Sequence, residues 1–237
     1  MEQYNLTIEL LSDALPGSGE GFGAVIDQDV VFDDLGIPYI PAKRIKGLLR
    51  DSYEEIFNLI YSTGSGTASL PSSPESLFGR VGMESEAPLY FSNLYIEDYK
   101  NLRNYILNKK TTIPDLFTTE SVSSTFTYTR QQTAIDQDIG IALKGSLRTI
   151  RVLKCGLKFS GEINFDGNSP HDNAINLLTL ACLNLKRMGT KRTRGFGEIA
   201  CFLHDCSDIK TDLKETALNW LASFDKTVPN SGEGNKQ

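Results

Sequence analysis

The sequence predicts an α+β fold assembled from two strand–helix–strand units, and three patterns carry this prediction. Apolar residues keep helical period over residues 44–61, and residues 174–185 are apolar on nearly all sides, as in a buried helix. Every second residue of 155–165 is apolar or glycine, which is strand periodicity. The 237 residues, 40% hydrophobic and 23% charged, have ordinary globular composition and can bury a core without disulfides.

The first half of the chain predicts strand, helix, strand. Residues 5–11 are rich in Leu, Ile and Thr and form the first predicted strand. Pro38 and Pro41 hold an extended lead-in to the helix at 44–61, because the residue before a proline avoids helical backbone angles. Residues 88–96 are the next predicted strand.

The second half repeats this order and adds one helix. Ser169 and Pro170 suit the N-cap and first position of a helix, and Gly189 suits its C-terminal cap. The predicted elements are a strand at 155–165, a helix at 174–185, a strand at 196–203 and a helix at 211–224.

Taken together, the elements follow the β-α-β-β-α-β order of a ferredoxin-like (RRM-like) domain with a C-terminal helix. We predict one domain over residues 1–225, with insertions at about 62–75 and 97–127, and a disordered polar tail at 226–237. Such a sheet leaves one face free for a ligand, but the fold does not say which ligand.

Composition and motif content exclude several classes of protein. No run approaches the ~18 apolar residues of a membrane span, and the N-terminus lacks the basic region of a secretory signal. The four cysteines form no CxxC pair and the two histidines have no zinc-ligand spacing. These features predict a cytoplasmic protein with reduced thiols and no membrane partner.

The charge distribution predicts a polyanionic partner despite a net charge of −6. Segments 43–50, 144–158 and 186–194 hold 14 of the 24 basic residues and no acidic residue. A polyanion responds to local potential more than to net charge. One such run is often only a solvated face, but three in one fold favour a nucleic-acid surface.

The strongest of these segments is KRMGTKRTRGFGE at residues 186–198. Glycines let the backbone approach a partner closely, and arginine forks match phosphate oxygens. The segment has no Walker spacing, and it follows a helix and precedes a strand, the reverse of a dinucleotide-binding turn. The alternative is an exposed basic turn with a glycine cap. Its candidate RNA-binding residues are Lys186, Arg187, Lys191, Arg192, Arg194, Gly195 and Gly197.

The second segment is GIPYIPAKRIKGLLR at residues 36–50. Lys43, Arg44 and Lys46 crowd the first turn of the predicted helix, where the helix dipole disfavours cations, and Arg50 follows one turn later. A bound phosphate would offset this conflict. Gly47 costs the helix about 1 kcal/mol relative to alanine, which close approach of another backbone would explain. The alternative is a basic helix face with a tolerated glycine.

In combination, these segments resemble the RAMP (repeat-associated mysterious protein) superfamily of CRISPR-associated proteins. The resemblance rests on IPAKRIKGLLR at 40–50, LFG at 77–79, GSL at 145–147 leading into GLKFSG at 156–161, and the loop at 189–197, in family order. It implies a ferredoxin-like fold, in agreement with the element order. The chain departs from the family at Asn93, where many relatives carry Asp.

Within the superfamily, GAVIDQDVVFD at residues 23–33 is similar to the backbone subunit of type III effector complexes. This resemblance implies that the chain polymerises along CRISPR RNA together with other subunits of the complex. It also implies that Asp27 cleaves bound target RNA with a divalent metal, Mg²⁺, of which Asp27 is the ligand. The insertion at 97–127 would be a thumb-like element that reaches a neighbouring subunit.

Several alternatives stay open at this stage. Asp27 could simply end a turn, and Asp29, Asp33 or Asp136 could carry the chemistry instead. The chain could be a non-catalytic structural RAMP subunit, or a ferredoxin-like binding module outside CRISPR systems. It could also be a CRISPR RNA-processing endoribonuclease, but those enzymes commonly use a histidine near the N-terminus, and this sequence has none before His171.

Overall fold

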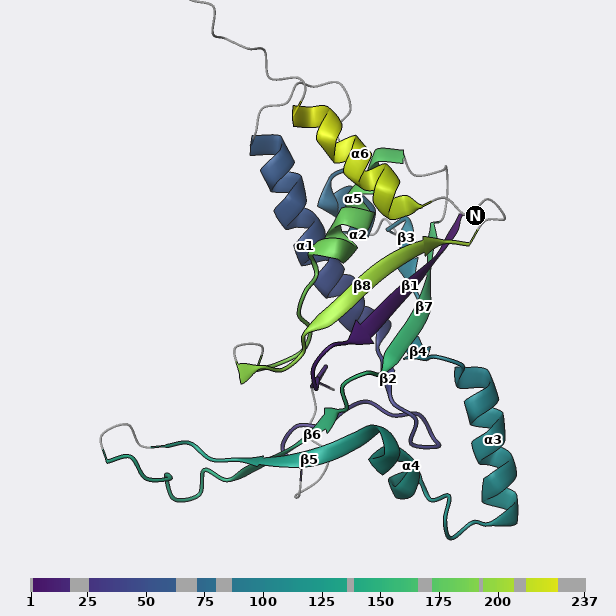
Figure 1. Ribbon diagram of the computed structural model, residues 1–237, viewed down its shortest axis with the longest axis vertical. Helices are drawn as coiled ribbons and strands as arrows, with labels where there is room; N and C mark the ends of the chain where they lie inside the picture. Colours follow the sequence, from purple (N-terminus) through teal and green to yellow (C-terminus); the bar gives the residue numbers. More distant parts are fainter. Residues whose placement is uncertain are drawn as a thin grey trace, which may run out of the picture.

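A computed structural model shows a mixed α+β protein, as the sequence predicts, with a central antiparallel sheet, a separate two-stranded hairpin and helices (Figure 1). The structure describes residues 2–17, 26–62, 72–79, 87–135, 139–165, 172–191, 194–206 and 212–225.

Eight strands and six helices lie within these described residues. The strands are β1 (Gln3–Leu10), β2 (Tyr39–Ile40), β3 (Leu89–Phe91), β4 (Leu94–Ile96), β5 (Thr127–Gln132), β6 (Arg148–Leu153), β7 (Lys158–Phe165) and β8 (Ile199–Asp205); the helices are α1 (Ala42–Ser62), α2 (Pro74–Phe78), α3 (Tyr99–Thr112), α4 (Thr119–Phe126), α5 (Asp172–Asn184) and α6 (Leu213–Asp225).

The central sheet has the strand order β2-β4-β7-β1-β8, with β3 also paired to β7. Strand β1 lies between β7 and β8 and is antiparallel to both, so that Leu6 is opposite Gly161 on one side and Leu203 on the other. Burial alternates along β1, where Leu6 and Ile8 are fully buried and Thr7 between them is not. This period of two places one face of the sheet in the core.

Helices α1, α5 and α6 pack against one another beside this sheet (Figure 1). Ile45, Leu49 and Tyr53 are completely buried and follow helical spacing along α1, which confirms the helix predicted at 44–61. The Tyr53 hydroxyl donates a hydrogen bond to the Ser72 carbonyl at 2.8 Å, and burial raises the pKa of Tyr53. The long α1 is therefore fixed by buried side chains from its first turn, at Ile45, to Ile60 near its C-terminus.

Three predictions about elements need correction. The strand predicted at 88–96 is two short strands, β3 and β4, because Ser92 leaves regular pairing and its hydroxyl accepts the Glu162 N–H at 2.7 Å. Gly189 is not the cap of α5, which ends at Asn184; it has a φ of +85° and lies against the Leu15 carbonyl.

The third correction concerns residues 127–153, where the sequence predicts no strand and the structure has the β5–β6 hairpin. The sequence predicts no strand there because Thr127–Gln132 is polar, and because apolar and polar residues do not alternate cleanly over 148–153. The hairpin nevertheless contributes Ile150 and Val152 to the core. It lies with α3 and α4 at the end of the molecule away from α6 (Figure 1).

Some predictions lie outside the described residues: the caps Ser169 and Pro170, His171, most of the 62–75 insertion, and the tail at 226–237. The described end of that insertion includes Pro74, which begins α2. Across the described helices, none is both long and apolar enough to cross a membrane.

Candidate nucleic-acid interface

The two basic segments, far apart in sequence, meet at one cleft of about 670 Å³. The first two turns of α1 form one wall, and Met188–Thr190 with Pro16 form the opposite wall. The lining residues are Pro16, Ile40, Pro41, Lys43, Arg44, Gly47, Leu48, Asp51, Met188, Gly189 and Thr190.

The first turn of α1 concentrates positive charge at this cleft. It contains no acidic residue, and the Lys43 and Arg44 side chains are exposed. The Asn93 side-chain oxygen accepts the Ala42 N–H at 2.9 Å, so the helix start is anchored to the β3–β4 connection by a neutral amide instead of a carboxylate. Two cations therefore face the cleft from a first helical turn that has no acidic residue, and Asp51, further along α1, is the acidic residue in the cleft lining.

The other basic residues of α1 lie beside the cleft. Lys46 is half-buried, and that burial, together with the nearby charge of Arg50, lowers the pKa of Lys46. Lys46 and Lys43 line a second hollow of about 320 Å³ between α1 and β3. The basic surface of α1 thus extends from the main cleft to the β3 side, with Lys43 bordering both.

Gly47 has no structural requirement within the described chain. It is exposed in the cleft wall, and a Cβ atom placed on it would meet no atom within 4 Å. Glycine inside a helix costs stability relative to alanine. Because Gly47 has no side chain, α1 leaves space at this position that a partner backbone can enter.

The two glycines predicted in the loop differ from each other. At Gly197, with φ of +74°, a Cβ would lie 2.0 Å from the Met188 carbonyl oxygen, and the Gly197 N–H already donates to the Asp13 carbonyl at 2.8 Å. The fold itself therefore requires glycine at 197. Gly195, with φ of +78°, has open space around it and stays available to a partner.

The basic residues at the start of the segment, Lys186 and Arg187, have different surroundings from Lys191 near its centre. Lys186 and Arg187 line a hollow of about 270 Å³ with Asp51 and Glu55 of α1. These carboxylates reduce the local positive potential there. Arg192 lies outside the described residues, Lys191 contacts the hairpin through Gln132, and the charge of Arg194 lies near Lys191.

Asp27 is exposed and attached to the edge of β6. Its N–H donates to the Thr149 carbonyl at 2.9 Å, and its Oδ2 accepts the Thr149 N–H at 2.8 Å. In the part of the chain that the structure describes, Oδ1 has no hydrogen-bond partner. Asp27 is therefore held in place by backbone bonds while one carboxylate oxygen remains available.

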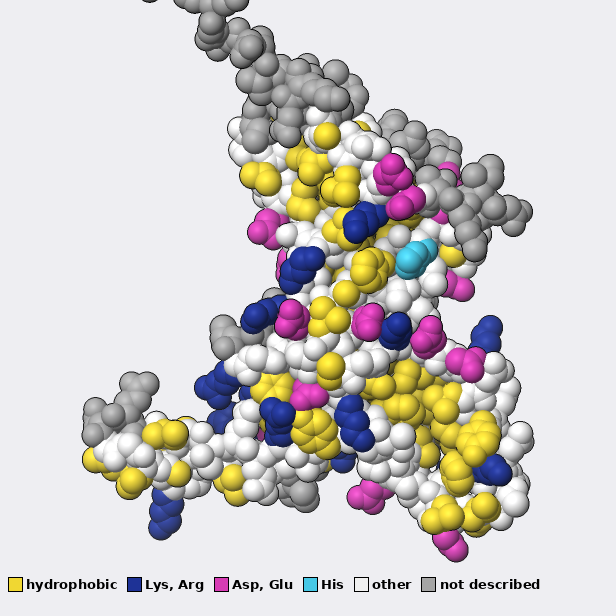
Figure 2. Space-filling view, in the orientation of Figure 1, with side chains coloured by type: hydrophobic (Ala, Val, Ile, Leu, Met, Phe, Trp, Pro, Cys, Tyr) yellow, Lys and Arg dark blue, Asp and Glu magenta, His cyan; other side chains and the backbone are white. Residues whose placement is uncertain are grey.

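The basic loop lies close to Asp27. The Lys191 ammonium donates a hydrogen bond to the side-chain oxygen of Gln132, the last residue of β5. Burial lowers the pKa of Lys191, and the positive charges of Arg194 and Arg148 lower it further, whereas the charge of Asp27 opposes them. Figure 2 shows Lys and Arg side chains gathered around the base of the hairpin and the adjacent loop, left of centre.

The other acidic candidates have structural roles. Asp29 is 5% exposed, forms an ion pair with Arg151 at 3.2 Å, and accepts the Val30 N–H at 2.7 Å. Asp136 lies outside the described residues. The carboxylate of Asp33 also accepts several hydrogen bonds, which are described next. Of the three described candidates, Asp27 is thus the exposed carboxylate.

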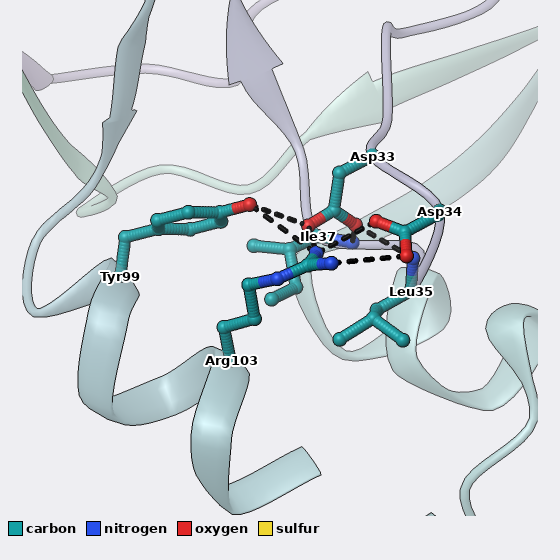
Figure 3. Close-up of polar contacts among 6 residues, drawn as sticks. All are labelled: Asp33, Asp34, Leu35, Ile37, Tyr99 and Arg103. Carbon is teal, nitrogen blue, oxygen red and sulfur yellow. Dashed lines mark hydrogen bonds and ion pairs between the residues drawn. The ribbon is translucent and has the colours of Figure 1, made fainter. Parts of the chain in front are cut away.

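Asp33 is the centre of a network that attaches α3 to the chain before β2 (Figure 3). Its Oδ1 accepts the N–H groups of Leu35 at 2.9 Å and Ile37 at 2.8 Å. Its Oδ2 accepts the Tyr99 hydroxyl at 2.8 Å and the Arg103 guanidinium at 2.9 Å. A carboxylate with four donors is committed to holding the fold.

Asp13 connects the basic loop to the hairpin, a role that the sequence does not predict. Its carboxylate accepts hydrogen bonds from the Tyr128 hydroxyl and, at 3.1 Å, from Arg130. The Arg130 guanidinium lies 5.0 Å from the centre of the Phe196 ring in the loop. These contacts, with the bond from Gly197 to the Asp13 carbonyl, fix the loop against β5. No local pattern marks Asp13, because its partners are distant in sequence.

The donor set for a metal at Asp27 is small. Among the described residues, no group of three or more His, Cys, Asp or Glu side chains gathers to hold a metal ion. Mg²⁺ is commonly bound by one or two carboxylates together with substrate phosphates and water. The exposed Asp27 carboxylate would suit such a site as its single protein ligand, with the remaining ligands supplied by phosphate oxygens and water.

Comparison with known proteins agrees with this geometry. The RAMP superfamily matches residues 7–200. A chain of the type III-B Cmr-beta complex in its apo state superposes with a TM-score of 0.60 at 14% identity, covering 87% of this chain and 98% of that one. A chain of Cmr-beta bound to cognate target RNA gives a TM-score of 0.62 at 13% identity, covering 86% and 97%.

No significant match to a curated protein sequence is found. At 13–14% identity the structural likeness establishes the fold. The superfamily match itself spans most of the sequence and includes the first basic helix turn and the glycine-rich loop that meet at the cleft. The resemblance predicted from the sequence is confirmed: the chain belongs to the RAMP superfamily.

Proposed function

We propose that this RAMP chain is a guide RNA-binding backbone subunit of a type III CRISPR effector complex that cleaves target RNA at Asp27. The observation that carries the proposal is the meeting of the α1 first turn with the glycine-rich loop at one cleft, with an exposed Asp27 beside the same loop. CRISPR RNA, target RNA and other subunits of the complex are the proposed partners.

The topology supports a ferredoxin-like assignment of the fold. Strands and helices β1, α1, β3–β4, β7, α5 and β8 follow the β-α-β-β-α-β order, and β1 lies centrally between β7 and β8. The β5–β6 hairpin with α3 and α4 is then an insertion between the second and third strands of this domain.

Guide binding is supported by charge and backbone access at the cleft. Lys43 and Arg44 supply cations that suit phosphates, and Gly47 leaves open backbone in the cleft wall. Lys191, Arg194 and the open Gly195 follow Thr190 in the adjacent loop. Single-stranded nucleic acid binds such basic grooves by its backbone without sequence preference. The cleft thus suits a guide whose sequence varies.

Cleavage is supported by the exposure of Asp27 and by its fixed position. A carboxylate near a phosphodiester can orient a 2′-hydroxyl or hold Mg²⁺, and the proposed dependence on Mg²⁺ requires phosphate oxygens to complete the metal shell. The cations beside Asp27 would bring the phosphate backbone close to it.

A non-catalytic structural subunit is the second candidate. One observation favours it: within the described ranges, no group of three or more His, Cys, Asp or Glu side chains gathers at Asp27 or elsewhere to hold a metal. The RNA-processing alternative has less support, because His204 lies on β8 and does not line the cleft, and His171 is outside the described residues.

The deciding experiment is cleavage of a guide-complementary RNA by the reconstituted complex with Mg²⁺. We expect Asp27→Ala to abolish cleavage while guide and target binding persist, because binding rests on the separate basic residues. Asp27→Asn is the closest isostere and should also be inactive. Asp29→Asn serves as the control for a nearby buried carboxylate. Cleavage at the wild-type rate by both Asp27 variants would remove Asp27 from the chemistry, and a wild-type complex that never cuts would favour the structural subunit.

A further inference from the structure

The base of the hairpin contains a cluster of cations that the two predicted segments do not explain. Arg148, the first residue of β6, is directly opposite Gln132, the last residue of β5. The Gln132 side chain accepts a hydrogen bond from the Lys191 ammonium. Residues directly opposite in an antiparallel pair share one face of the hairpin with Cβ atoms about 5 Å apart. Lys191 is therefore held close to Arg148.

The same site lies beside Asp27. Thr149, the next residue after Arg148, accepts the Asp27 N–H on its carbonyl at 2.9 Å and donates its own N–H to the Asp27 Oδ2 at 2.8 Å. Three segments from distant parts of the sequence thus converge here: the turn at Asp27, the hairpin base and the loop at Lys191. Each is fixed by a hydrogen bond, so the cations are positioned before any ligand arrives.

The charges at this site are unbalanced. Arg148 and Arg194 are exposed, and within the described chain neither guanidinium forms an ion pair. The pKa of Lys191 is lowered by burial and by both arginines, which shows that the cations repel one another. Asp27 is the opposing charge, and one of its oxygens is already bound by Thr149. An anion would relieve this repulsion.

We propose that Arg148 and Lys191 together bind one phosphate of the RNA strand that passes Asp27. The inference rests on the proposed function and adds a site on the hairpin to the cleft at α1. The arginine fork supplies two parallel donors to phosphate oxygens, and Gln132 orients the lysine for a third. The phosphate can come from the guide or from the target, which have the same backbone chemistry.

The test measures RNA affinity against KCl concentration for four single variants: Arg148→Gln, Arg148→Lys, Lys191→Gln and Lys214→Gln. Lys214 is an exposed lysine on α6, remote from the site, and serves as the matched control. One arm uses a single-stranded guide RNA alone. A second arm titrates a complementary target into the guide-loaded complex. Thermal unfolding of each variant shows that it is folded.

We expect Arg148→Gln and Lys191→Gln each to reduce the slope of log affinity against log salt by up to about 0.7, the value for complete loss of the phosphate contact that the two residues share. Arg148→Lys should keep the wild-type slope, because the charge remains, which a purely structural role would not predict. A change in the guide arm assigns the site to the guide, and a change in the target arm alone assigns it to the target.

Two results overturn the inference in distinguishable ways. If Arg148→Gln behaves like Lys214→Gln in both arms while Lys43→Gln at the cleft lowers the slope, the hairpin site is wrong and the proposed function stands. If the wild-type protein binds neither RNA, the proposed function and the hairpin site fail together.

Discussion

Gly47 and Gly197 differ in what keeps each of them glycine. Gly197 is required by the fold, because a Cβ would overlap the Met188 carbonyl, whereas the described chain imposes no requirement at Gly47. The sequence places both in basic, glycine-containing segments and does not separate them. The structure separates the two glycines, and this difference provides a test of RNA binding at the cleft.

Gly47→Ala should stabilise the protein by up to about 1 kcal/mol, because alanine is the better helix former and its methyl group meets no neighbour. The same methyl group would protrude into the cleft, so the affinity for guide RNA should fall. Urea unfolding and RNA titration measure the two effects. Gly197→Ala is the contrast and should lose stability. Unchanged RNA affinity of a stabilised Gly47→Ala protein would place RNA elsewhere.

Asp33 is predicted to be a stability residue and not a catalytic one. Asp33→Ala should lower the free energy of unfolding by about 3 kcal/mol, because two backbone N–H groups, Tyr99 and Arg103 lose their shared acceptor. The control is Asp34→Ala, which removes an exposed partner of the same arginine and should change stability little. Equal effects in urea unfolding would show that the network around Asp33 contributes little.

At the scale of elements, the β5–β6 hairpin has two parts with different roles. Its paired base is joined to the core and to the basic loop, through Ile150, Val152 and the bond between Gln132 and Lys191. Beyond the base, the described parts of the arm, residues 133–135 and 139–147, extend away from the body of the molecule (Figure 1). Its described apolar side chains are strongly exposed: Ile135, Ile139, Ile141, Leu143 and Leu147.

A deletion that tests the role of the insertion must therefore leave the base of the hairpin in place. Removal of 97–127 would take away the start of β5 and the buried Ile106 and Val122, so we expect that variant to unfold. Replacing the arm, residues 133–147, by Asn-Gly joins the paired residues Gln132 and Arg148 with a favoured two-residue turn.

The arm replacement should leave the thermal unfolding midpoint close to wild type, because none of the described residues removed is buried. It should impair assembly of several copies along a long RNA, since exposed apolar groups on an extended arm are typical of contacts between proteins. Sedimentation of the chain with RNAs of increasing length measures this. Normal assembly without the arm would mean that neighbouring subunits contact each other through other surfaces.

At the scale of the whole molecule, an acidic protein carries a localised basic region. The net charge is −6, yet the cleft and the hairpin base gather Lys43, Arg44, Arg148, Lys191 and Arg194. This charge distribution disfavours RNA binding on the acidic parts of the surface and favours it at the cleft and the hairpin base.

Replacing Lys191, Arg192 and Arg194 by alanine should weaken binding to all RNA sequences alike. The salt dependence should flatten by up to about 2 units of slope, at roughly 0.7 per phosphate contact on single strands. Replacing Lys100, Lys109 and Lys110 of α3 by glutamine removes the same charge at a distance and should have a smaller effect. If the two triple variants lose the same slope, total charge and not the loop determines binding.

The sequence alone determined the features that depend on neighbouring residues. The helical period of α1, the buried α5 and the two basic, glycine-containing segments are local patterns, and the structure has α1 beginning and ending within two residues of its predicted limits. Family membership also followed from motifs in order along the chain. The hairpin was missed because β5 is polar and its pairing partner lies beyond a long arm.

Tertiary structure decided which of the candidate residues are accessible. Asp27, Asp29 and Asp33 occur within seven residues, and their different roles come from partners far along the chain: Thr149, Arg151 and the residues of α3. The bond between Asp27 and Thr149 spans 122 positions. The cleft likewise forms from α1 and Met188–Thr190 only after the sheet brings them together. Periodicity records local backbone preference, whereas burial and charge neighbours depend on which distant segments pack together.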